Sequence, residues 1–136
     1  MTNRVMPHGE GPISLLLKHG VEFATRVPTP WRGTVGACYA NSQYLVKRRK
    51  GWRYVEGYAV HLIPMEHAWC LDPEGNVVDP TWGEDGAVDY FGIEFDMELV
   101  REIRRIPGGR SYSVLHTWCK PQIYPRLEKY LNKETR

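Results

Sequence analysis

A β-hairpin is predicted by one stretch of the chain, His67-Ala68-Trp69-Cys70-Leu71-Asp72-Pro73-Glu74-Gly75-Asn76-Val77-Val78-Asp79-Pro80-Thr81-Trp82. Its centre, Pro73-Glu74-Gly75, suits a three-residue loop in which a type I turn precedes a glycine in the left-handed conformation. Such a loop pairs Asp72 with Asn76. Continuing the antiparallel register places Trp69 opposite Asp79 and His67 opposite Thr81.

Side chains alternate between the two faces of a strand, so this register sorts the hairpin into two sets. The sets are His67, Trp69, Val77, Asp79 and Thr81 on one face, and Ala68, Cys70, Val78 and Pro80 on the other. His67 and Asp79 are then diagonal neighbours, about 7 Å apart at the backbone and within side-chain reach. An aspartate in that position can hold an imidazole in one tautomer and one orientation, as the third member of a catalytic triad does.

A thiol is expected at the start of a helix upstream of this hairpin. Residues 37–50 are predicted to be helical, with Thr34 as the cap and Gly51 as the stop. Cys38 then lies in the first turn, where free backbone N–H groups and the positive end of the helix dipole favour a thiolate. We therefore expect the pKa of the Cys38 thiol to lie below its usual value of about 8.5, and lower still if His67 forms an ion pair with it.

Four segments together resemble the transglutaminase-like superfamily, which belongs with the papain-like thiol enzymes. They are Gly36-Ala37-Cys38, Arg53-Tyr54-Val55-Glu56-Gly57-Tyr58, His67-Ala68-Trp69 and Val78-Asp79-Pro80-Thr81-Trp82. In that family the cysteine opens a helix that packs on an antiparallel sheet, and the histidine and aspartate lie on successive strands. The resemblance covers positions 33 to 82. It implies Cys38 as the nucleophile, His67 as general base and acid, and Asp79 as the residue that orients His67.

The resemblance implies an enzyme that acts on amide bonds through an acyl-enzyme intermediate, and we expect no cofactor. Family members include peptidases, amidases, cross-linking acyl transferases, deamidases and inactive versions, so the family indicates the chemistry better than the substrate. Hydrolysis of a protein or peptide is favoured here, because a small domain has little surface with which to exclude water or hold a second substrate. The alternatives are transglutaminase-type transfer to an amine and a catalytically inactive binding module on the same scaffold.

Substrate contacts are expected from Trp69, Trp82 and Asn41. Trp69 could equally belong to the core, and for Tyr90 and Phe91 a core role is favoured. No glutamine upstream of Cys38 offers a side-chain oxyanion donor. The oxyanion hole is therefore left with the backbone N–H of Cys38 and an unassigned second donor.

The composition fits a single domain over residues 1–136, with 42% hydrophobic and 12% aromatic residues for a core. Near the N-terminus the apolar run over residues 13–17 is too short for a membrane span or a secretory signal. Three cysteines, an odd number, argue against a disulfide framework. We therefore expect a cytoplasmic protein without a membrane partner.

Charge is unevenly distributed, although the net charge is only +2. The segment before position 54 has nine basic and two acidic residues. Residues 54–100 include eleven acidic residues and no Lys or Arg. The segment from 101 onward has nine basic and three acidic residues. An acidic cleft rim would attract Lys-containing peptides or amines, whereas solvated carboxylates near basic helices are the simpler interpretation. For the basic run at 47–50 a solvated helix end is likewise simpler, and the near-neutral total argues against a nucleic-acid partner.

The remaining patterns predict an α+β domain with a papain-like or transglutaminase-like core, in which the nucleophile helix packs on a small antiparallel sheet. Helices are expected over 12–19, 97–105 with Asp96 as cap, and 122–132, and strands over 52–62 and 111–118. The pattern His-x-Trp-Cys occurs at 67–70 and at 116–119 and offers zinc ligands. No metal site is predicted, because residues three apart on a strand point to opposite faces.

Overall fold

The computed structural model describes residues 11–23, 26–83, 89–105 and 113–118. The described elements are, in chain order, α1 (Pro12–His19), β1 (Val21–Phe23), α2 (Cys38–Arg48), β2 (Arg53–His61), β3 (Ile63–Leu71), β4 (Val77–Val78), β5 (Asp89–Phe95), α3 (Met97–Arg104) and α4 (Val114–Trp118). The predicted α+β class is confirmed, as are the helix over 12–19 and the strand over 52–62. The helix that follows Asp96 is also confirmed, since the Asp96 carboxylate accepts the backbone N–H of Glu98 at 2.8 Å.

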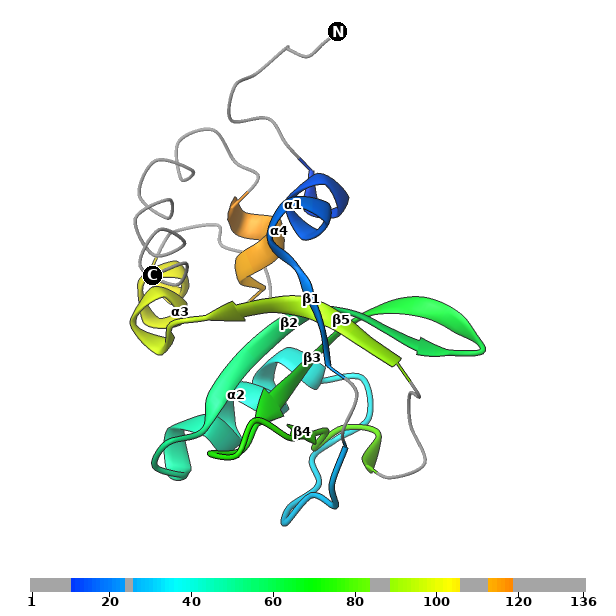
Figure 1. The fold of residues 1–136 in the computed structure, drawn as a ribbon. Helices are drawn as coiled ribbons and strands as arrows, with labels where there is room; N and C mark the ends of the chain where they lie inside the picture. Colours follow the sequence, from blue (N-terminus) through cyan, green and yellow to red (C-terminus); the bar gives the residue numbers. More distant parts are fainter. Residues whose placement is uncertain (1–10, 24–25, 84–88, 106–112, 119–136) are drawn as a thin grey trace, which may run out of the picture.

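The strands form one curled antiparallel sheet in the order β1-β5-β2-β3-β4 (Figure 1). Its central strand, β2, pairs with β3 on one side and with β5 on the other. Gly57 of β2 lies opposite Gly92 of β5, and a Cβ atom on Gly57 would lie 2.2 Å from the Phe91 carbonyl oxygen. A Cβ on Gly92 would lie 2.8 Å from the Trp69 ring. Gly92 therefore leaves the room that the indole of Trp69 occupies, and Gly57 leaves room for the backbone of β5.

The hairpin has the predicted turn and register. Asp72 N–H donates to the Asn76 carbonyl at 3.0 Å, and Gly75 has a φ of +86°. Cys70 pairs with Val78 and Leu71 with Val77. Regular pairing ends at Val78, so Asp79 begins a turn instead of continuing the strand opposite Trp69.

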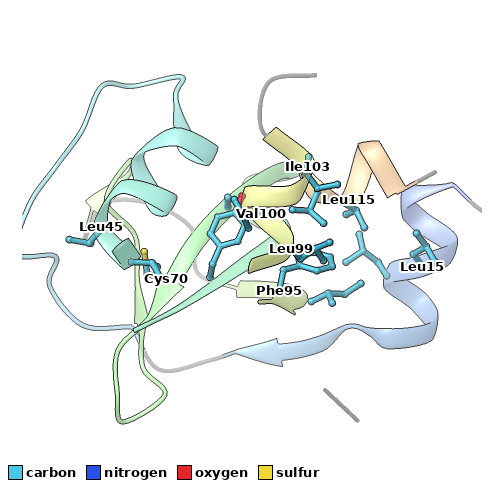
Figure 2. Packing of buried hydrophobic residues seen from close by; sticks show 14 of the residues in the cluster. Leu15, Leu45, Cys70, Phe95, Leu99, Val100, Ile103 and Leu115 are labelled. Atoms are coloured by element: carbon cyan, nitrogen blue, oxygen red, sulfur yellow. The ribbon is translucent and has the colours of Figure 1, made fainter. Parts of the chain in front are cut away.

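The sheet separates two clusters of buried side chains, and the two faces of the hairpin contribute to different ones, as predicted. Ala68, Cys70 and Val78 belong to the larger cluster, which side chains from all four helices join (Figure 2). Trp69 and Val77 belong to the smaller cluster with Leu71, Val55, Ala59 and Tyr90. Helix α2 packs mainly on β3, with Leu45 and Val46 in the larger cluster. The N-terminus of α2 is thereby held beside the sheet.

Two local predictions are wrong. The predicted strand over 111–118 is helix α4 at 114–118, because the carboxylate of Glu56 accepts the N–H groups at the start of that helix. The residue that caps α2 is Ala37, which has no capping side chain, and not Thr34; the Thr34 carbonyl instead accepts the N–H of Ala37. The expected helix over 122–132 lies outside the described residues. In the described segments, no helix combines the length and apolarity needed to cross a membrane.

Candidate active site

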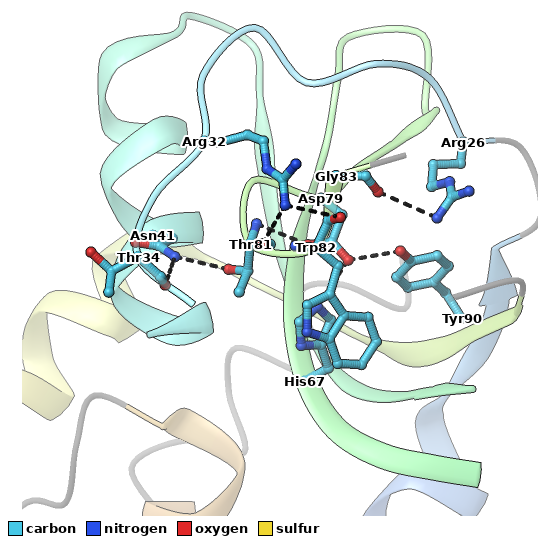
Figure 3. A network of polar contacts seen from close by, with 10 residues as sticks. All are labelled: Arg26, Arg32, Thr34, Asn41, His67, Asp79, Thr81, Trp82, Gly83 and Tyr90. Carbon is cyan, nitrogen blue, oxygen red and sulfur yellow. Dashed lines mark hydrogen bonds and ion pairs between the residues drawn. The ribbon is translucent and has the colours of Figure 1, made fainter. Parts of the chain in front are cut away.

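The carboxylate of Asp79 lies at the centre of a buried polar network (Figure 3). One oxygen, Oδ1, accepts the backbone N–H groups of Thr81 at 3.0 Å and Trp82 at 2.9 Å. The other, Oδ2, accepts the Tyr90 hydroxyl at 2.7 Å and lies 2.9 Å from Nε2 of His67. The predicted contact between His67 and Asp79 is thus confirmed.

The turn that holds this carboxylate is stabilised by a hydrogen bond within it and by hydrogen bonds from two arginines. Gly83 N–H donates to the Asp79 carbonyl at 2.9 Å, and Gly83 has a positive φ of +66°. The guanidinium of Arg32 donates to the carbonyls of Thr81 and Trp82, each at 3.3 Å. Arg26 donates to the Gly83 carbonyl at 3.3 Å. The Asp79 side chain therefore has little freedom to turn away from His67.

Asp79 is ionised at neutral pH. Burial by itself would raise the pKa of this carboxyl, but the hydrogen bond and charge of His67 and the donors from Trp82 and Tyr90 lower it below its ordinary value of 3.8. An ionised Asp79 can only accept a hydrogen bond, so Nε2 of His67 carries a proton, and whenever the imidazole is neutral its lone pair lies on Nδ1. Within the described part of the chain, Nδ1 has no hydrogen-bond partner.

The imidazole of His67 is also fixed by stacking. Its ring lies 3.8 Å from that of Trp82, at an interplanar angle of 17°. Trp82 is half-buried, so it covers one face of the imidazole and keeps part of its own surface open to solvent. A ring held by Asp79 at one nitrogen and by Trp82 on one face presents Nδ1 in a single direction.

Cys38 is the first residue of α2, as predicted, and it is half-buried. Burial raises the pKa of its thiol to about 11, although backbone N–H groups of Ala68 and Tyr39 act in the opposite direction. The negative charges of Glu56 and Asp79 raise it further. The expected lowering of the pKa is therefore wrong, because the loss of water around the sulfur outweighs the benefit of the helix N-terminus.

Of the three predicted catalytic residues, His67 and Asp79 are in contact, and Cys38 lies nearby without a hydrogen bond to His67 in the described part of the chain. Ala68, whose N–H points at the Cys38 sulfur, is the residue after His67, so the thiol lies beside the strand that carries the imidazole. No hydrogen bond joins the Cys38 thiol to His67 among the residues that the structure describes. The resting arrangement is therefore a preformed His67–Asp79 pair with a protonated thiol nearby.

The three predicted substrate contacts have different surroundings. Trp69 is 0% exposed and lies in the smaller core cluster, so it presents no surface to a substrate. Asn41 is buried, and its amide donates to the Thr34 carbonyl at 2.8 Å and to the Thr81 hydroxyl at 2.9 Å. Both of its donors are thereby used, one in the loop before α2 and the other to tie α2 to the Asp79 turn. Trp82 is the one of the three that stands next to His67 with exposed surface.

Tyr90 and Arg32 were not predicted as site residues. Tyr90 lies on β5, and the pairing of β5 with β2 brings its hydroxyl to Asp79. No local sequence pattern indicates this pairing of distant segments. Arg32 comes from the loop before α2, and its two backbone contacts likewise depend on the folded arrangement. As for metals, the described residues contain no group of three or more His, Cys, Asp or Glu side chains placed to hold an ion.

Comparison with protein-family models, with curated proteins and with solved structures found no match to this chain. The geometry of the site is therefore the basis for the functional interpretation.

Tyr90→Phe is expected to lower the free energy of unfolding by about 1.5 to 3 kcal/mol at pH 7, the range for a hydrogen bond to a charged group. The ring can keep its packing, while Asp79 loses a donor. Because the folded pKa of Asp79 is below 3.8, the stability that depends on its charge is present above that value and lost as the pH falls through the folded pKa. The difference between the two proteins should therefore shrink in acid.

Urea denaturation at pH 7 and at successively lower pH measures this difference. The matched control is Tyr58→Phe, whose hydroxyl makes only an exposed 3.4 Å contact with Glu66. Equal losses in both variants, or a loss at Tyr90 that does not change with pH, would contradict the assigned role of the Tyr90 hydroxyl.

Proposed function

We propose that the protein is a thiol enzyme of the peptidase or amidase type, built on a papain-like, transglutaminase-like core. In this proposal Cys38 is the nucleophile, His67 is the general base and acid, and Asp79 orients His67. The observation that carries it is the 2.9 Å contact between Nε2 of His67 and an Asp79 carboxylate held by three further donors. That contact leaves Nδ1 as the nitrogen that can exchange a proton with a thiol.

The elevated pKa of Cys38 determines how the reaction begins. A thiol with a pKa of about 11 is protonated at neutral pH, so its proton must leave as the sulfur attacks. In the proposed step the sulfur bonds to the carbonyl carbon of the amide, and the thiol proton passes to Nδ1 of His67. Asp79 stabilises the imidazolium that forms, through Nε2.

The tetrahedral intermediate formed by this attack then breaks down to an acyl-enzyme. His67 returns the proton to the leaving amine, the carbon–nitrogen bond breaks, and a thioester joins the acyl group to Cys38. Water attacks the thioester, gives one proton to His67, and releases the carboxylic acid with the free thiol. An amine in place of water would yield a new amide, which is the transglutaminase-type alternative.

The inactive binding module has one observation in its favour, namely that burial raises the pKa of the Cys38 thiol. A thiol that never loses its proton would leave the His67–Asp79 pair with a structural role only. The two functions differ in whether Cys38 accepts an acyl group with the help of His67. An activated ester tests this difference without knowledge of the natural substrate.

The test is incubation with p-nitrophenyl acetate at neutral pH, followed by peptide mass spectrometry of the thiols. We expect acetylation of Cys38 in the wild type and a loss of at least about 100-fold in His67→Ala, the usual lower range for removal of a general base. Cys70→Ala is the matched control, because the Cys70 thiol is buried and donates to the Ser42 carbonyl at 3.4 Å. It should acylate like the wild type.

If Cys38 is acylated equally with and without His67, or is acylated in neither protein, the proposal of an enzyme is overturned and the binding module is favoured. When acylation does depend on His67, lysine methyl ester added during turnover separates the two reactions. Acetate as the product of the acetyl-enzyme indicates that water is the acceptor, and acetylated lysine methyl ester indicates transfer to an amine.

A further inference from the structure

A recess lined by aromatic and basic side chains lies at the C-terminal end of α2. It has a volume of about 420 Å³, and its lining includes Trp31, Tyr44, Arg48, Arg49, Lys50 and Trp52. A second recess of about 610 Å³ shares Trp52 and the three cations and extends to Lys47 and to Arg101 of α3. We call these two adjoining recesses the α2 groove. Arg48 lies ten positions after Cys38 on α2, roughly 15 Å along the axis at the rise of an α-helix, so the groove is distinct from the proposed active site.

The aromatic rings in the groove alternate with cations. The rings of Trp31 and Tyr44 lie 4.7 Å apart, and the guanidinium of Arg48 lies 4.0 Å from the centre of the Tyr44 ring. Arg49 lies 5.6 Å from the centre of the Trp52 ring. Tyr44 is 39% exposed, whereas Trp31 and Trp52 are half-buried and pack against the larger core cluster, so the rings lie where the core meets the surface. Such contacts hold guanidinium groups in place while their N–H groups stay available to a ligand.

In the part of the chain that the structure describes, no carboxylate pairs with the cations of the groove. No acidic residue of the described segments lines either recess. Among the described residues, Lys47, Arg48, Arg49 and Lys50 form no salt bridge. The local potential is therefore positive although the net charge of the chain is only +2. The near-neutral total charge, which by itself disfavours a nucleic-acid partner, does not reveal this local excess of positive charge.

We propose that the α2 groove binds single-stranded nucleic acid. Its phosphates would contact Arg48, Arg49 and Lys50, and its bases would stack on the exposed aromatic surface of Trp31, Tyr44 and Trp52. Proteins that bind single strands without sequence preference combine these two features, a cationic groove and aromatic platforms. Two adjoining recesses that share Trp52 offer room for more than one nucleotide. An acidic peptide would use the cations but not the exposed surface of the rings, although Trp31 and Trp52 also pack against the larger core cluster.

Fluorescence anisotropy with labelled oligo-dT and oligo-U of about ten nucleotides tests the proposal on the full chain. Three phosphate contacts on a single strand predict a slope near −2 for log K against log salt, which is a loss of roughly 20-fold between about 50 and about 200 mM salt. Arg48→Ala should weaken binding and make that slope shallower by about 0.7. Tyr44→Ala should weaken binding by about five-fold or more.

The matched controls are Tyr44→Phe, which keeps the ring, and Lys18→Ala, which removes one positive charge from α1 instead of α2. Both should bind like the wild type, as should Cys38→Ala, which separates this site from the proposed chemistry. Alanine is a strong helix former, so Tyr44→Ala and Arg48→Ala are expected to retain α2, which thermal melting followed by circular dichroism verifies.

Three results would overturn the proposal. One is the absence of binding at the lowest salt concentration. Another is an equal loss in Lys18→Ala and Arg48→Ala, which would indicate unspecific attraction. The third is competition by poly-glutamate or by AMP as strong as competition by the unlabelled oligonucleotide, which would assign the groove to an acidic protein or to a mononucleotide, respectively.

Discussion

Asp79→Asn is expected to slow acylation of Cys38 by roughly 10⁴-fold while the protein stays folded. The backbone N–H groups of Thr81 and Trp82, at 3.0 and 2.9 Å from Oδ1, require an acceptor, so the amide oxygen of the asparagine would face them. Its NH₂ group would then point at Nε2 of His67. Since both groups cannot donate, the ring proton would move to Nδ1. An Nδ1 that carries a proton cannot accept one from the thiol of Cys38.

The measurement pairs the rate of p-nitrophenol release with ¹⁵N chemical shifts of the His67 ring, which report the tautomer. Asp72→Asn is the matched control, because Asp72 lies in the same hairpin and its Oδ1 also accepts two backbone N–H groups, at 3.0 and 2.8 Å. It should acylate like the wild type. Wild-type rates in Asp79→Asn, or a changed rate with an unchanged tautomer, would show that Asp79 does not act through the protonation state of His67.

Glu56→Ala is expected to reduce the free energy of unfolding by about 3 to 5 kcal/mol, since each buried donor left unpaired costs about 1 to 3 kcal/mol. The Glu56 carboxylate is fully buried and accepts the Tyr54 hydroxyl at 2.6 Å and the Ser113 hydroxyl at 3.1 Å. It also accepts the N–H groups of Val114 at 2.8 Å and Leu115 at 2.9 Å. Alanine would leave all four donors without this acceptor and detach α4 from β2.

Urea denaturation of Glu56→Ala beside Glu94→Ala measures the effect. Glu94 is the matched control, because it is a β-strand glutamate whose ion pair with Arg53 is partly exposed and stabilises by less than about 1 kcal/mol. A loss at Glu56 no larger than that at Glu94 would contradict the anchoring role. A protein too unstable to purify would leave Glu56→Gln as the variant to measure, with a smaller loss because one oxygen acceptor remains.

Glu56 also predicts a pH dependence of stability. Burial raises the pKa of this carboxyl above its ordinary value of 4.5, so the folded protein retains a proton at a pH where the unfolded chain has lost it. The part of the stability that arises from this raised pKa is therefore complete below 4.5 and is lost as the pH rises through the folded pKa. That slope should be absent in Glu56→Gln, which cannot titrate.

The features that sequence reasoning found correctly depend on neighbours along the chain. Pro73-Glu74-Gly75 favours one loop, and that loop sets the register of the hairpin. Asp96 caps α3 through Glu98, two positions away. Alternation predicts Asp79 on the face of His67, and the contact forms there, although β4 ends at Val78 and a turn places the carboxylate.

The remaining features depend on segments that meet only in the folded protein. Glu56 lies almost sixty positions before the N–H groups of α4, so residues 114–118 are helical where the local pattern predicted a strand. Tyr90 reaches Asp79 from a strand that was not predicted, and the burial of Cys38 reverses the expected direction of its pKa. Sequence by itself determined the hairpin and the candidate residues, because turn chemistry and alternation act over a few positions. Their protonation and their partners were decided by tertiary structure, because loss of water and the arrival of distant donors and charges depend on the whole fold.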